Sequence, residues 1–130
     1  MLITKRSDYA IRICRALQDG KIHSIREICE VENIPKAFAS KIIRDMEMNG
    51  LVKSERGNKG GYCLKKGLNE LTLHDLLITT EDDLFILHCM KEECCRNTAD
   101  LPCSVHIEMA RIQSLLEKEL KDKTLEELLS

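Results

Sequence analysis

The chain has 130 residues, of which 43% are hydrophobic and 32% are charged, and it contains seven cysteines but no tryptophan. This length predicts one domain, and the absence of a signal-peptide pattern or a membrane-spanning apolar run leads us to expect a cytoplasmic protein with no membrane partner. Residues 1–66 carry 14 Lys and Arg against eight Asp and Glu, whereas residues 67–130 carry six Lys and Arg against 14 Asp and Glu. This contrast is typical of a nucleic-acid-binding part joined to a sensing or pairing part. A merely uneven surface would give the same counts.

The first predicted helix lies within residues 4–20. Its apolar residues recur at helical spacing: Ala10, Ile13, Cys14 and Leu17. Thr4 can cap the start of this helix and Gly20 can end it. Asp8 lies in the first turns, where the helix dipole alone accounts for an acidic residue.

A helix-turn-helix is predicted next. Ser24 and Glu27 have the spacing of a capping box, which predicts the start of a short second helix. After a tight connection, Pro35 suits the first position of a third helix that ends near residue 49. Two short helices separated by a few residues resemble a helix-turn-helix.

The third predicted helix has two unlike faces. Four apolar residues point inward: Phe38, Ile42, Ile43 and Met46. The outward face is small, hydroxylic and cationic, and comprises Lys36, Ala37, Ser40, Lys41 and Arg44. Such a face can enter a major groove, with Ser40 and Lys41 at base edges, Ala37 at a thymine methyl group, and Lys36 and Arg44 at phosphates. A solvated basic face would have the same composition.

A glycine-rich hairpin follows the third helix. Residues 51–55 and 62–64 are strand-like, and the stretch between them reads R-G-N-K-G-G. Arg56 and Lys59 at a projecting tip can enter a minor groove or clamp a phosphate. A phosphate-binding loop is excluded because the stretch lacks the required Gly-Lys-Ser/Thr ending and precedes a strand. The pattern therefore predicts a wing.

Residues 89–106 hold four of the seven cysteines, namely Cys89, Cys94, Cys95 and Cys103, with His106 one helical turn after the last. Dense thiolates in an irregular segment indicate an iron-sulfur cluster or another metal site. A structural zinc site, a disulfide loop and a coincidence of small buried residues remain alternatives. The other cysteines are interpreted as small buried hydrophobes: Cys14, Cys29 and Cys63.

The last elements are helical. Thr72 and Asp75 mark one helix start, and Thr124 another. Between them, a long helix is predicted over residues 103–121. Its apolar seam contains Ile107, Ala110, Ser114 and Leu115, broadened by Ile112, Leu116 and Leu120. A seam this long, with no remaining domain to cover it, is most simply buried against a second copy.

This order of elements resembles the IscR/NsrR family of bacterial winged helix-turn-helix regulators. The resemblance runs from T-K-R-S-D-Y-A at residues 4–10 to T-L-E-E-L at residues 124–128, and its most specific parts are the R-G-x-x-G-G-Y wing and the cysteine segment. It implies a homodimer that binds a palindromic double-stranded DNA operator. In many members each protomer carries an iron-sulfur cluster, of the 2Fe-2S or 4Fe-4S type.

The resemblance also implies a ligand set. Cys89 and Cys95 show the family spacing of the first two cysteines, Cys103 opens the long helix as the third does, and Cys94 is an alternative to Cys95. In one branch of the family a histidine three residues after the third cysteine completes the site, which here is His106. In the other branch an aspartate of the partner subunit does so, which here is Asp8, and we favour Asp8.

The sequence thus predicts a mainly α fold, a winged helix-turn-helix with a small β-hairpin wing and a long C-terminal dimerisation helix. Residues 1–66 are expected to bind DNA, and residues 67–130 to supply the cluster-binding loop and dimerisation helices of one compact domain. We expect a transcription regulator that senses redox state, nitric oxide or iron-sulfur status. The alternatives are a cluster-free regulator controlled by a protein or small-molecule partner, or one with structural zinc. No base–nucleophile pair or phosphate cradle indicates an enzyme.

Overall fold

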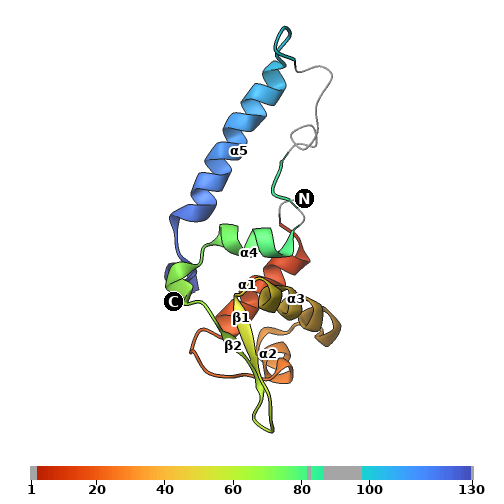
Figure 1. Ribbon diagram of the computed structural model, residues 1–130, viewed down its shortest axis with the longest axis vertical. Coiled ribbons are helices and arrows are strands. Elements are labelled where there is room, and N and C mark those ends of the chain that lie inside the picture. Colours follow the sequence, from red (N-terminus) through yellow and green to blue (C-terminus); the bar gives the residue numbers. More distant parts are fainter. Residues whose placement is uncertain (1–2, 82, 87–97, 130) are drawn as a thin grey trace.

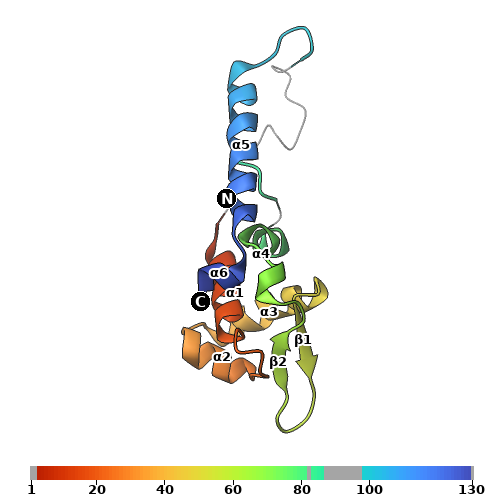
Figure 2. The same cartoon turned by 90° about the vertical axis from the view of Figure 1, so that its left-hand side faces the viewer.

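The computed structural model describes residues 3–81, 83–86 and 98–129, and it is mainly helical with one small hairpin. In chain order its elements are α1 (Lys5–Ala16), α2 (Ile25–Glu32), α3 (Lys36–Met48), β1 (Val52–Glu55), β2 (Gly61–Leu64), the 3-10 helix η1 (Leu68–Glu70), α4 (Leu73–Thr80), α5 (Ser104–Asp122) and α6 (Leu125–Leu129). Figures 1 and 2 show α1 to α4 and the hairpin gathered in one body, from which α5 extends as a rod. The predicted winged helix-turn-helix with a long C-terminal helix is confirmed.

Side-chain caps begin the helices where the sequence predicted them. The Thr4 hydroxyl accepts from the backbone N–H of Arg6 at 3.2 Å, which caps α1. Thr72 and Asp75 form a complete capping box at the start of α4. Such caps satisfy N–H groups that have no partner inside the helix, and each contributes about 1 kcal/mol. Pro35 lies one position earlier than predicted, because it precedes the first helical residue of α3.

The core is built around α1. This helix contacts α2, α3 and α4, and its four predicted apolar residues are fully buried. The same cluster includes Leu71 and Leu76 before and within α4, and Leu125 of α6. One apolar core therefore joins residues on both sides of the expected division at residue 66. Burying each such side chain contributes about 1.5–3 kcal/mol, so α1 fixes the relative positions of the other helices.

The predicted inward position of Phe38 is wrong. Phe38 is 49% exposed, whereas its neighbour Ala39 is 2% exposed and packs in the core. Ala39 and the three remaining predicted residues form one narrow arc of α3, and Phe38 lies about 100° around the helix from Ala39. The Phe38 ring instead lies beside α1, with its centroid 5.9 Å from that of Tyr9.

The apolar residues of α5 divide into two groups. Leu120 is buried in a small second cluster with Leu77 and Leu84, and Leu116 is partly buried at the edge of this cluster. Other large apolar side chains on α5 are exposed: Val105, Ile107, Ile112 and Leu115. They leave an apolar surface along the rod that the described part of the chain does not cover. No helix among the described residues combines the length and apolarity needed to cross a membrane.

Candidate nucleic-acid interface and metal-ligand residues

The helix-turn-helix is held against α1 by two arginines. Glu32, at the end of α2, is 6% exposed, and its carboxylate pairs with Arg15 at 2.5 Å. The hydrogen bond to Glu32, together with its negative charge, raises the pKa of the Arg15 guanidinium. Arg12 donates from Nη1 to the backbone carbonyl oxygen of Glu32 at 3.1 Å. Both arginines therefore hold α2 against α1.

The turn between α2 and α3 depends on Asn33. Its φ of 55° lies in the left-handed region, which asparagine tolerates better than most residues. The following residue, Ile34, donates its backbone N–H to the Cys29 carbonyl oxygen at 3.1 Å and buries its side chain. The turn is therefore held by a backbone hydrogen bond and by the buried side chain of Ile34. Together these contacts fix the direction in which α3 leaves α2.

The outer face of α3 has the predicted composition. Lys36, Ala37, Lys41 and Arg44 are exposed, and Ser40 is half-buried. Among the described residues, none of the three cations on this face takes part in an ion pair. A row of unpaired cations beside a hydroxyl and a methyl group suits phosphate and base-edge contacts. The structure thus presents the whole predicted set on one surface.

The predicted wing is confirmed as an antiparallel hairpin. Its register pairs Val52 with Leu64 at the base and Glu55 with Gly61 near the tip. The tip residues 56–59 are all exposed, including Arg56 and Lys59. Figures 1 and 2 both place this tip at the end of the molecule opposite α5. Arg56 and Lys59 therefore add two cations at the far end of the body that also carries α3.

The tip end of strand β2 is fastened to the connection before α2. His23 and Tyr62 exchange backbone hydrogen bonds of 2.9 and 2.8 Å. A Cβ atom on Gly61 would lie 2.3 Å from the His23 carbonyl oxygen, so only glycine allows this approach. The His23 ring lies between Glu27 and Asp19, at 3.0 and 2.9 Å. These two hydrogen bonds raise the pKa of His23.

We expect His23→Gln to lower the free energy of unfolding at acidic pH more than at alkaline pH. Because the folded-state pKa is raised above the unfolded value of about 6.5, this stabilisation is fully present below pH 6.5 or so and disappears as the pH rises through the folded pKa. The loss should stay below about 1 kcal/mol, since the Asp19 and Glu27 side chains are 43% and 58% exposed and water screens their charges. Urea titrations of wild type and variant at about pH 5 and about pH 9 measure it. An equal deficit at both pH values would contradict a role for the imidazolium charge.

Two candidate metal ligands lie at the start of α5. Cys103 is the N-cap residue of this helix and is partly exposed. His106 follows three residues later in the first turns of α5 and is also partly exposed. Residues three apart share one side of a helix, as the sequence predicted for this pair. Cys89, Cys94 and Cys95 lie outside the described residues.

Asp8 lies on α1, and its carboxylate pairs with Arg12 at 3.2 Å, with half of the Asp8 side chain exposed. Figures 1 and 2 place α1 in the body and the beginning of α5 at the distant tip of the rod. Asp8 and Cys103 of one chain therefore lie far apart in this conformation. A site containing both would need Asp8 from a second copy, which is the arrangement that the family resemblance implies.

The remaining cysteines lie in the body, where Cys14 and Cys63 are buried and Cys29 is partly buried. Cys14 is fully buried in α1, and the loss of water contact raises the pKa of its thiol to about 12. Burial also raises the pKa of Cys29 in α2. Thiols in this state stay protonated at neutral pH and are poor metal ligands. Cys63 of β2 is buried as well. The structure thus supports the interpretation of these cysteines as packing residues.

Comparisons with known proteins agree with this architecture. The sequence matches the Rrf2 family, described as an iron-dependent transcriptional regulator, over residues 3–130. It is 28% identical over 116 residues to a protein of Aquifex aeolicus (strain VF5) whose name places it among HTH-type transcriptional regulators, covering 88% of this chain and 81% of that one.

Two solved structures share the fold. CymR (YrzC), the global cysteine regulator of B. subtilis, has a TM-score of 0.81 at 22% identity, with 99% of this chain and 96% of that chain covered. IscR of T. potens has a TM-score of 0.73 at 19% identity, with 99% and 86% covered. At such identities the likeness extends to the fold alone.

Proposed function

This chain belongs to the Rrf2 family of transcriptional regulators, and we propose that it acts as a homodimer that binds a palindromic operator and senses redox state, nitric oxide or iron-sulfur status through a cysteine-ligated iron-sulfur cluster. As a member of this family it is a DNA-binding transcription regulator and not an enzyme. One observation carries the DNA-binding part of the proposal. The exposed residues of α3 and the wing tip form a cationic surface on the body of the protein.

On this surface, α3 is the reading helix. Ser40 and Lys41 lie near the middle of its outer face and are assigned to base edges, with Ala37 at a thymine methyl group. Lys36 and Arg44 flank them and are assigned to phosphates. At the wing, Arg56 and Lys59 are assigned to the adjacent minor groove or its phosphates. Phosphate contacts supply affinity and base contacts supply selectivity, so the two groups can be separated experimentally.

We expect Arg44→Ala and Ser40→Ala to have different effects on DNA binding. Arg44→Ala should weaken binding to operator and unrelated DNA alike, and lower the slope of log K against log salt by about 0.9 per protomer. Ser40→Ala should reduce the ratio of the affinity for operator DNA to the affinity for unrelated DNA, and it should leave that slope unchanged. Fluorescence anisotropy over a salt series, with a duplex that the wild-type protein selects from a random pool, measures both quantities.

Lys121→Ala is the matched control, because it removes one exposed cation at the end of α5. For this variant, the slope of log K against log salt and the ratio of operator to unrelated-DNA affinity should equal those of the wild type. If Lys121→Ala and Arg44→Ala lowered the slope equally, α3 would have no special role in phosphate contact.

The dimer in this proposal forms through α5. The exposed Val105, Ile112 and Leu115, with the half-buried Met109 and Leu116, give an apolar strip along one side of the rod. Val105, Met109, Ile112 and Leu116 are spaced four, three and four residues apart, which is the spacing of a paired helix seam. This seam differs from the predicted one, because at 100° per residue Ile107, Ala110 and Ser114 lie on the opposite side of α5. A second copy of α5 is the simplest partner for such a seam, and it would give the twofold symmetry of a palindromic operator.

The sensing part of the proposal rests on the cysteine segment and on the family description. Cys89, Cys95 and Cys103 are assigned as thiolate ligands, with Cys94 as the alternative to Cys95. Asp8 of the partner or His106 is assigned as the fourth ligand. Three thiolates and one oxygen or nitrogen donor match iron-sulfur chemistry, and such a cluster supplies a centre that responds to oxidation or nitric oxide.

A zinc site remains the second candidate for the same residues, because three cysteines and one histidine also form a zinc-binding set. Zinc would fasten the segment and give no redox response. A regulator without any metal, controlled by a protein or a small molecule, is the third. Metal and sulfide analysis of protein purified without oxygen separates the three: iron with sulfide, zinc alone, or neither.

A further inference from the structure

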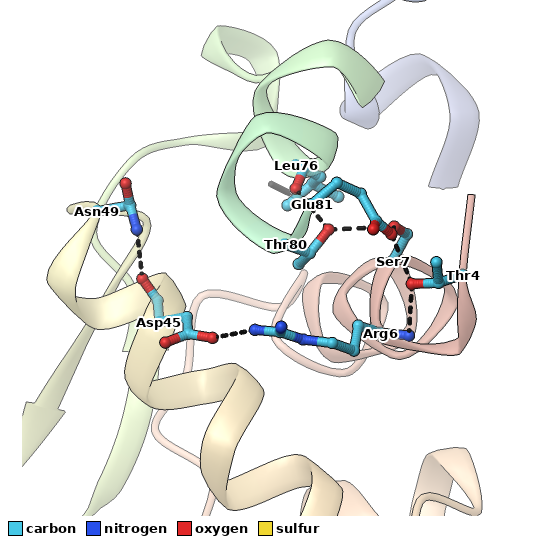
Figure 3. A network of polar contacts seen from close by, with 8 residues as sticks. All are labelled: Thr4, Arg6, Ser7, Asp45, Asn49, Leu76, Thr80 and Glu81. Atoms are coloured by element: carbon cyan, nitrogen blue, oxygen red, sulfur yellow. Dashed lines mark hydrogen bonds and ion pairs between the residues drawn. The ribbon is translucent and has the colours of Figure 1, made fainter. Parts of the chain in front are cut away.

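A polar cluster joins the first turn of α1 to the end of α4. Ser7 is 0% exposed and Thr80 is 3% exposed, and their hydroxyl oxygens are 3.1 Å apart. The carboxylate of Glu81, the C-cap residue of α4, accepts a hydrogen bond from the Thr4 hydroxyl at 2.5 Å and another from the Ser7 hydroxyl. Figure 3 shows these side chains converging between the two helices. We name Thr4, Ser7, Thr80 and Glu81 the Glu81 latch.

The latch fixes the place where α1 begins. Hydrogen bonds to a carboxylate are stronger than those between neutral groups, and the Ser7 end of the latch is shielded from water. Thr4 is at the same time the N-cap of α1, because its oxygen accepts from the Arg6 backbone N–H. A shift of the first turn relative to α4 would therefore break the latch, and a shift of Thr4 away from Glu81 would also disturb the cap. Thr80 also donates to the Leu76 carbonyl oxygen at 3.1 Å, which ties the latch to the body of α4.

The same turn of α1 carries the arginine that neutralises the Asp45 carboxylate on α3. Arg6 lies between Thr4 and Ser7 in the chain, and its guanidinium pairs with the Asp45 carboxylate (Figure 3). Arg6 and Asp45 line a groove of about 390 Å³ together with Lys41 and Arg44 of the outer α3 face. Arg6 thus neutralises a carboxylate that stands beside two cations assigned to DNA.

We propose that Glu81 is a positioning residue for DNA binding. By holding the first turn of α1, the latch keeps Arg6 on Asp45, and the neutralised groove then accepts the phosphate backbone. Without the latch, Asp45 is left unpaired next to Lys41 and Arg44, where its negative charge repels phosphate. This inference rests on the proposed role of α3, and it adds a residue of α4 that does not itself touch DNA.

The test is the operator affinity of a set of variants. Glu81→Ala should raise the Kd for the wild-type-selected duplex at least about fivefold, the lower end of typical coupling between distant groups. Asp45→Ala alone should bind at least as tightly as the wild type, because no carboxylate remains to be neutralised. In the Asp45→Ala background, adding Glu81→Ala should change the Kd less than about twofold, which is the additivity limit for independent sites.

Glu126→Ala is the matched control, since it removes an exposed carboxylate from α6 with the same charge change, and it should leave the Kd unchanged. Circular dichroism confirms that each variant is folded at the assay temperature. If Glu81→Ala does not fold, Glu81→Gln retains an acceptor oxygen without the charge. It should raise the Kd by a smaller factor that Asp45→Ala again removes.

Two results would overturn the role of Glu81: an unchanged Kd in folded Glu81 variants, or a raised Kd that Asp45→Ala does not restore. A wild-type protein that selects no DNA would instead overturn the proposed function.

Discussion

A chain carrying both Ile112→Glu and Leu115→Glu is expected to be monomeric and to lose operator binding. Both side chains are exposed on α5, at 38% and 49%, so glutamates at these positions leave the described core of the chain intact. Across an apolar dimer interface they would bury unpaired carboxylates at a cost of about 3–5 kcal/mol. This cost corresponds to an increase of about 100-fold or more in the dimer Kd. A monomer contacts only one half of a palindrome and so loses most of its affinity.

Lys118→Glu is the matched control for this double variant. It changes the charge of an exposed position on the same helix by the same two units, but it removes no apolar side chain. Sedimentation velocity should show a dimer for the control and a monomer for the double variant, and anisotropy should show operator binding only for the control. A double variant that remained dimeric would place the dimer interface elsewhere than on α5.

The second large effect is expected from Cys103→Ser. A serine hydroxyl is a far poorer ligand for iron than a thiolate, so the variant should lose most of the bound iron and sulfide that the wild type retains. Cys103 is the N-cap of α5, where serine is also a favoured cap, so the helix itself should not be weakened. Iron and sulfide assays after anaerobic purification measure the loss.

Cys29→Ser is the control for Cys103→Ser, because it removes a thiol from α2 in the body. This variant should retain both iron and sulfide. Equal loss in the two variants would contradict the assignment of Cys103. In the same assay Asp8→Ala should make the cluster more labile than His106→Ala does. The reverse ranking would assign the fourth position to His106.

Local signals were sufficient to predict most of the fold. Thr4 and Thr72 begin their helices as expected, and the spacing of apolar residues in α1 identified its buried side. The wing followed from a glycine run, and Gly61 is required there because a side chain would collide with the His23 backbone. These features depend on residues close in sequence, so the amino-acid pattern contains the needed information. The outer face of α3 was predictable for the same reason.

Long-range contacts were not predictable in this way. The spacing of Phe38 fits a broad apolar stripe and predicts a core position, whereas its observed contact is with Tyr9 on α1. The pairs of Arg6 with Asp45 and of Ser7 with Glu81 join residues 39 and 74 positions apart. No local pattern marks such partners, since each is an ordinary charged or hydroxylic residue of an amphipathic helix. The sequence predicted where the helices lie, and the structure was needed to find what holds their ends together.

We propose that a cysteine-ligated iron-sulfur cluster alters how this dimer binds DNA. The most direct measurement is the operator Kd of anaerobically purified protein before and after chelation of its iron, with iron and sulfide assayed on the same samples. We predict bound iron and sulfide at the start, and a change in Kd of at least about fivefold when both are lost. A preparation that holds neither element after anaerobic reconstitution, or one whose Kd is the same with and without them, would contradict the account.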